Sequence, residues 1–148
     1  DAYVPAPGMD RFLARTPPIL SLAALEAGVD LMLGVDQQAL FGKSQRLLKM
    51  FADLMAARCP VFALISPDRS EHRGSHISFA HPQASAIMNA LIAQGVIGDF
   101  RAPDVLRFGL TPLYIRFEDI WQAVDILAGI MASGAWRLAQ HAEIKRVT

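Results

Sequence analysis

The chain has 148 residues, which suits one hydrophobic core, and its formal net charge is +0. A neutral chain without a basic run excludes the electrostatic footprint of a nucleic-acid-binding protein and of a polybasic membrane anchor, so we expect neither partner. Apolar residues form 53% of the sequence, a high share for a soluble domain. Glu26 and Asp30 interrupt the richest apolar stretch, so we do not expect a membrane span. The high apolar share instead indicates contact with another domain or subunit.

The first 18 residues predict an extended arm, because proline denies a helix its donors and biases the preceding residue towards extended backbone. The prolines of this arm are Pro5, Pro7, Pro17 and Pro18. Pro18 suits the first position of a helix, where no N–H donor is needed, and apolar residues at helical spacing continue that helix to about Leu33. Gly34 is expected to stop it, and Asp36 to cap the next helix.

Three more helices are predicted over residues 38–58, 81–94 and 117–133, where apolar residues recur at helical spacing. We expect Gly95 to end the helix over residues 81–94 and Gly134 to end the helix over residues 117–133. The side chains expected to face the core are Leu40, Phe41, Leu47, Leu48, Phe51, Leu54 and Met55 in the first helix, Ile87, Met88, Leu91 and Ile92 in the second, and Phe117, Ile120, Val124, Leu127 and Met131 in the third.

Four short apolar stretches predict strands over residues 61–66, 76–79, 96–101 and 105–110. Adjacent strand pairs with polar connections indicate a small mixed or antiparallel sheet with helices packed on one side. The predicted fold class is therefore α+β.

The residue types that commonly carry chemistry form no recognisable motif. The histidines His72, His76, His81 and His141 lack the arrangement of a metal site, so no metal is expected. Cys59 is the only cysteine, which excludes an intrachain disulfide and fits a reducing, cytoplasmic compartment. We interpret it as a small apolar residue at a helix end rather than a nucleophile. The stretch Arg73–Ser75 is interpreted as a hairpin turn, with anion binding as the alternative.

Two positions remain open on the residues alone. Arg107 interrupts an apolar strand, and periodicity favours a solvent-facing side chain; the alternative is a bidentate clamp for a carboxylate, which the planar guanidinium suits. Thr16 precedes Pro17 and Pro18. A turn with a helix cap is the simpler interpretation, and the alternative is a hydroxyl and backbone amides offered to an anion at a helix start.

Two long segments of the chain resemble one enzyme family. RFLARTPPILSLAALEAGVD, residues 11–30, resembles the segment that opens the small C-terminal domain of kynureninases. The rest of that domain is similar, in the same order, to RGSHISFAHPQASAIMNALIAQGVIGDFRAPDVLRFGLTPLYIRFEDIWQAVDIL, residues 73–127. The resemblance implies a pyridoxal 5'-phosphate enzyme of fold type I that hydrolyses the Cβ–Cγ bond of L-kynurenine to anthranilate and L-alanine in tryptophan catabolism. It also implies a homodimer with active sites at the subunit interface.

The resemblance assigns a role to two residues. Thr16 matches the position that contacts the cofactor phosphate of the neighbouring subunit, and Arg107 matches the arginine that binds the substrate α-carboxylate. One difference is Arg15, which stands where the family has glycine. Residues 1–18 are then the crossover from a missing large domain, and residues 19–148 are the C-terminal small domain.

The family's catalytic residues belong to the large domain. None of the chain's lysines matches the lysine that binds the cofactor covalently; these are Lys43, Lys49 and Lys145. No catalytic residue is therefore assigned here, and we expect the chain alone to be inactive and without bound cofactor. Two alternatives are a stand-alone interaction or regulatory domain derived from such an enzyme, and a domain of another fold type I enzyme such as a transaminase or desulfurase.

Overall fold

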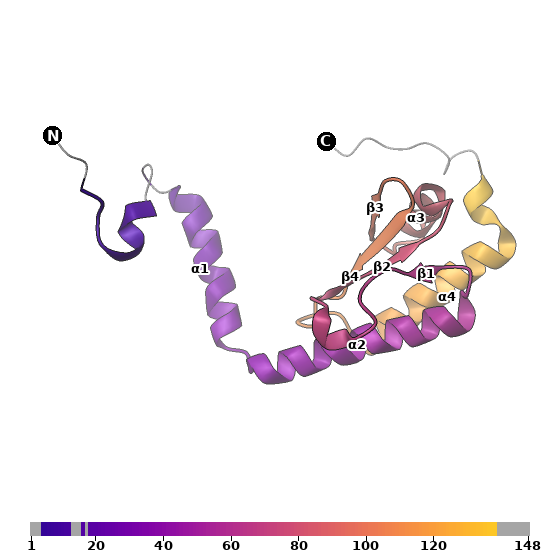
Figure 1. The fold of residues 1–148 in the computed structure, drawn as a ribbon, viewed down its shortest axis with the longest axis horizontal. Helices are drawn as coiled ribbons and strands as arrows, with labels where there is room; N and C mark the ends of the chain where they lie inside the picture. The colour runs from indigo at the N-terminus through magenta and orange to yellow at the C-terminus, as the bar shows by residue number, and fades with distance from the viewer. Residues whose placement is uncertain (1–3, 13–15, 17, 139–148) are drawn as a thin grey trace. The chain divides into compact units, whose positions relative to one another are not determined.

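The computed structural model describes residues 4–12, 16 and 18–138 (Figure 1). The chain divides into two compact units, residues 1–37 and 38–148.

The first unit contains a short 3-10 helix, Gly8–Phe12, and helix α1, Ile19–Leu33. The 3-10 helix lies within the segment predicted as an extended arm. Pro18 is the N-cap of α1 rather than its first helical residue, and its carbonyl accepts the hydrogen bond from the backbone N–H of Leu22 at 3.0 Å. Helix α1 carries apolar side chains on all sides, and none of its residues is buried.

The described residues of the second unit form three α-helices and four strands. The helices are α2 (Gln37–Arg58), α3 (Ala84–Ala93) and α4 (Phe117–Ser133), and the strands are β1 (Ala63–Leu64), β2 (His76–Ala80), β3 (Asp99–Arg101) and β4 (Val105–Gly109). Two 3-10 helices, Ser70–His72 and Ala135–Arg137, also lie in the described part of this unit. Among the described residues, no helix combines the length and the apolar character required to cross a membrane.

The four strands form one antiparallel sheet in the order β1-β2-β4-β3. Strands β2 and β4 are its centre, where Ile77 pairs with Phe108 and Phe79 with Leu106. These four side chains are buried. Since paired residues in adjacent strands share a face, the centre of the sheet turns its apolar face to the core.

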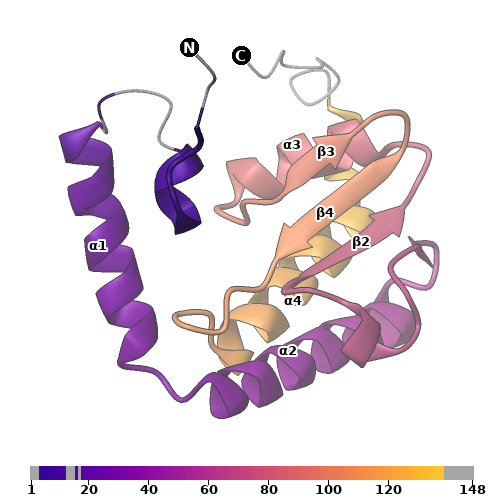
Figure 2. The same ribbon diagram turned by 60° about the vertical axis from the view of Figure 1, so that its left-hand side comes forward.

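The helices α2, α3 and α4 cover that apolar face (Figure 2). Among the described residues of this unit, no α-helix lies on the other face. Phe51 of α2 lies at the centre of the packing, with its ring 5.1 Å from that of Phe108 and 5.7 Å from that of Phe79. The predicted α+β class, a small antiparallel sheet with helices on one side, is confirmed.

Local sequence explains both ends of α4. At the start, the Asp119 carboxylate accepts the backbone N–H of Arg116 at 2.7 Å and also the Arg116 guanidinium, which satisfies donors that the first turn leaves free. At the end, Gly134 adopts the left-handed conformation with φ of 70°. Both boundaries agree with the prediction.

Several predicted details are wrong. Strand β1 has two residues rather than six, because the chain turns after Pro60 with the N–H of Phe62 bonded to the carbonyl of Cys59. Strand β3 begins at Asp99 instead of position 96, and α3 begins at Ala84 instead of position 81. Three side chains predicted to face the core are partly exposed: Phe41, Ile92 and Phe117. In α3 the buried row includes Ala84, so the inward face is rotated away from Ile92.

Candidate ligand-binding site

Arg107 lies in the middle of β4, on the sheet face opposite the helices α2, α3 and α4. Its neighbours Leu106 and Phe108 are buried, and alternation along a strand therefore directs Arg107 to the opposite face. The side chain is 39% exposed. Its position agrees with the solvent-facing interpretation that periodicity favoured.

The guanidinium of Arg107 is nevertheless not free, because the carboxylate of Asp99 occupies one of its edges. The Nε of Arg107 donates to Oδ1 of Asp99 at 3.0 Å, and Nη2 donates to Oδ2 at 2.5 Å. The two residues are register partners in β3 and β4, so both side chains project from the same face. This bidentate contact is the geometry in which arginine binds a carboxylate most specifically.

A second arginine contacts the same carboxylate. Nη2 of Arg101 lies 3.0 Å from Oδ2 of Asp99. The hydrogen bond from Arg107 holds the pKa of the Asp99 carboxyl below its ordinary value, and the positive charges of Arg107 and Arg101 act in the same direction. The same contact raises the pKa of Arg107. We call Arg101, Asp99 and Arg107 the charge cluster; with Asp99 ionised, its net charge is +1.

Thr16 belongs to the first unit, which also contains α1. It is exposed and lies two residues before Pro18, the N-cap of that helix. Pro18 contributes no side-chain hydrogen bond to the first turn of α1. A helix start with free N–H groups and a nearby hydroxyl suits an anion such as a phosphate. Arg15 lies outside the described residues.

Three other residues considered in the sequence analysis, Arg73, Cys59 and His81, have structural contacts in the fold. The Arg73 guanidinium donates to the carbonyls of Pro67 and Asp68, the latter at 2.8 Å, and so holds its own loop together. Cys59 is buried at the end of α2, where burial raises the pKa of its thiol. The His81 ring lies 4.8 Å from that of Phe62, accepts the N–H of Gln83 at Nδ1, and has a pKa lowered by burial.

No group of three potential metal ligands occurs among the residues that the structure describes. His141 lies outside them.

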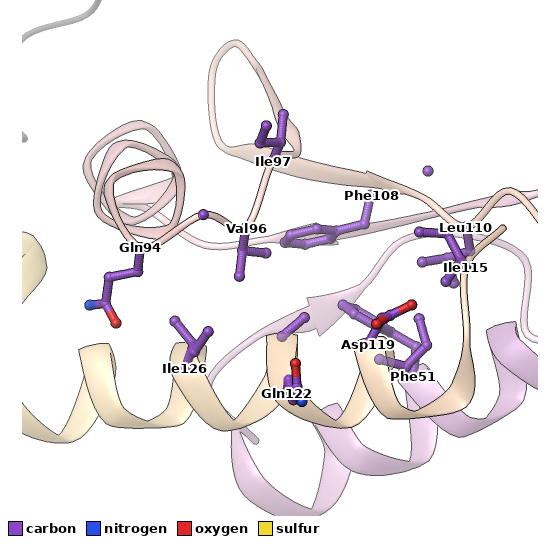
Figure 3. A pocket seen from close by; sticks show the side chains of 14 residues that line it. Phe51, Gln94, Val96, Ile97, Phe108, Leu110, Ile115, Asp119, Gln122 and Ile126 are labelled. Carbon is purple, nitrogen blue, oxygen red and sulfur yellow. The ribbon is translucent and has the colours of Figure 1, made fainter.

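The structure also contains a cavity of about 390 Å³ between α4 and the segment that leads from α3 into β3 (Figure 3). Its walls are mainly apolar and include Phe51, Phe108 and Ile126, while Gln94, Asp119 and Gln122 are its polar members. The Asp119 carboxylate is already bonded to Arg116. The cavity therefore brings together no free charged group and no nucleophile, and the charge cluster remains the better candidate.

Asp99 and Arg101 are the residues that sequence reasoning missed. The signal was present in the hairpin: if the turn at residues 102–104 pairs position 101 with 105, then Asp99 pairs with Arg107. An acidic and a basic residue directly opposite each other in an antiparallel pair are expected to interact.

Comparison with known proteins gives consistent matches. A family model described as "Kynureninase C-terminal domain" matches residues 40–127. The chain is 44% identical to a kynureninase of Burkholderia mallei (strain SAVP1) and to one of Burkholderia pseudomallei (strain K96243), with 99% of this chain and 36% of each relative aligned. It is also 44% identical to a kynureninase of Pseudomonas fluorescens, over 93% of this chain and 34% of that relative. The chain thus spans about a third of the length of these relatives.

Proposed function

The chain belongs to the kynureninase family and corresponds to its C-terminal domain, and from this premise we propose that it supplies ligand contacts to an enzyme that hydrolyses L-kynurenine to anthranilate and L-alanine. In this proposal Arg107 binds the substrate α-carboxylate, and Thr16 contacts the cofactor phosphate of a neighbouring subunit in a cytoplasmic homodimer. The reacting groups come from a large domain that this chain does not contain.

The observation that carries the proposal is the guanidinium of Arg107, held in a bidentate contact on an open sheet face. A side chain that binds the Asp99 carboxylate in this geometry has the charge and the planar donor arrangement to bind a second carboxylate. Fixing the substrate carboxylate at one point orients the remaining bonds of the amino acid relative to the cofactor.

The residues present fit one end of pyridoxal 5'-phosphate. The start of α1 with Thr16 suits its phosphate. Both described lysines already have partners: Lys43 donates to the carbonyl of Pro112 at 2.6 Å, and Lys49 pairs with Asp53. When bound, the cofactor would supply an electron sink for the bond-breaking step. This chain would contribute binding and orientation.

The test is an assay of anthranilate release from L-kynurenine. We define the complete enzyme as this chain joined to the large domain that precedes it in its gene or, where the gene encodes none, to the corresponding part of the Pseudomonas fluorescens relative. The complete enzyme should release anthranilate, and the chain alone should not. Arg107→Ala in the complete enzyme should raise KM by about tenfold or more, from the loss of a charge-assisted hydrogen bond. Turnover by the isolated chain, or an unchanged KM in Arg107→Ala, contradicts the corresponding part of the proposal.

A further inference from the structure

We propose that Asp99 is a positioning residue for carboxylate recognition: it holds one edge of the Arg107 guanidinium so that the outer edge, which carries Nη1, faces the ligand. This inference rests on the proposed role of Arg107 in substrate binding. It adds Asp99 and Arg101 to the groups that determine how the ligand carboxylate is bound.

The arrangement of donors is the first argument. Asp99 accepts hydrogen bonds from Nε and Nη2 of Arg107, the two donor nitrogens on one edge of the guanidinium. Within the described ranges, no hydrogen bond involves Nη1 of Arg107. A guanidinium has two edges at which a carboxylate can bind in parallel, so an occupied Nε edge leaves the Nη1–Nη2 edge for a second anion.

The second argument concerns preorganisation. An arginine side chain at a partly exposed strand position has many rotamers, and a ligand that binds it must restrict them. Two hydrogen bonds to a register partner in the adjacent strand fix the plane of the Arg107 guanidinium in advance. The ligand then meets a group that is already oriented.

The third argument concerns charge. Asp99 alone would cancel the charge of Arg107 and weaken the attraction for an anion. Arg101 contacts the same Asp99 carboxylate, and the charge cluster therefore keeps a net charge of +1. Asp99 can hold Arg107 in place without making the site neutral.

The test measures KM and kcat for L-kynurenine in the complete enzyme for four variants: Asp99→Asn, Arg107→Ala, the double variant and Asp125→Asn. Asp125 is the matched control, because it also pairs with an arginine, Arg58, but does so between α4 and α2. We expect Asp99→Asn to raise KM by about threefold to tenfold with little change in kcat, the pattern of lost uniform binding. Asp125→Asn should leave both constants unchanged.

The double variant separates positioning from a general structural effect. If Asp99 acts through Arg107, then Asp99→Asn adds no further increase in KM once Arg107 is alanine. An unchanged or lower KM in Asp99→Asn, with Arg107→Ala impaired, overturns the inference and leaves the proposed function intact, since Asp99 would then be only a competitor for the guanidinium. An equal increase in both backgrounds also overturns it. An unaffected Arg107→Ala enzyme overturns the proposed function, and the inference with it.

Discussion

Gly98 lies so close to Arg107 that a β-carbon at position 98 would be 2.8 Å from the backbone carbonyl oxygen of Arg107. The same β-carbon would lie 2.8 Å from the terminal methyl group of Met88 and 3.1 Å from the ring of Phe108. The methionine can move aside, but the carbonyl belongs to a central strand. The backbone that carries the candidate ligand-binding arginine is thus packed directly against a glycine.

We therefore expect Gly98→Ala to lower the free energy of unfolding by about 1–3 kcal/mol, the usual range for overpacking. Gly109→Ala is the matched control, because a β-carbon at Gly109 meets no atom within 4 Å. Urea denaturation of the chain measures both variants. Equal denaturation midpoints for Gly98→Ala and the unaltered chain would show that β4 can shift without cost.

Phe51 joins α2 to the two central strands through its ring contacts with Phe79 and Phe108. It is almost completely buried, whereas Phe41 in the same helix is 54% exposed. Phe51→Ala should reduce the free energy of unfolding by about 3–5 kcal/mol, and Phe41→Ala by only about 0.5 kcal/mol. Thermal or urea unfolding of both variants checks the difference, and similar losses for the two would contradict the packing described here.

Two glycines near the end of α4 should respond to alanine in opposite directions. Gly129 lies inside the helix with no atom within 4 Å of an added β-carbon, and Gly129→Ala should stabilise the chain by about 0.5–1 kcal/mol. Gly134 has φ of 70°, so Gly134→Ala should destabilise it by about 1 kcal/mol. Melting temperatures of the two variants test this prediction, and only the direction of each shift matters. If both variants melt higher, or both melt lower, than the unaltered chain, the prediction is wrong.

The cap of α4 predicts a dependence on pH. Hydrogen bonds from the side chain and the backbone of Arg116 lower the pKa of the Asp119 carboxyl in the folded state. A carboxyl with a lowered folded-state pKa stabilises the fold above its unfolded pKa, and this stabilisation disappears as pH falls through the folded value. The melting temperature of Asp119→Asn should therefore lie below that of the unaltered chain at pH 7, and the gap should narrow progressively as pH falls below about 4.

Glu118→Gln is the control for Asp119→Asn. It removes a negative charge from the same first turn of α4, but Glu118 accepts no backbone hydrogen bond there among the described contacts. At neutral pH, Glu118→Gln should lower the melting temperature by less than Asp119→Asn does. A gap that stays constant from pH 7 to about pH 3 would show that the Asp119 charge is not the stabilising feature.

Local signals predicted the helices of the second unit better than its strands. The bounds of α4 follow from its apolar spacing and from Gly134, which are properties of neighbouring residues. The length of β1 depends instead on a turn after Pro60 and on the pairing with β2, which brings Ala63 opposite Ala80. Such long-range pairing is not encoded in a window of a few residues.

The candidate site likewise has one part that local sequence predicts and one part that depends on long-range pairing. Strand alternation sufficed to place Arg107 on the open face, because the apolar residues on either side fix the direction of its side chain. Its contact with Asp99 depends on the register of two strands across a turn, and periodicity within one strand contains no such information. The role of Thr16 depends on a cofactor and a second subunit, and it stays a prediction.

The sheet ends at both sides on very short strands, the two residues of β1 and the three of β3. An edge strand can recruit a strand of another molecule only if it offers a sufficiently long row of unpaired backbone groups. Strand β1 is too short for this, and β3 carries the charged residues Asp99 and Arg101. The residues proposed to orient a ligand thus also place charged side chains on an edge strand, a feature that discourages edge-to-edge pairing of sheets.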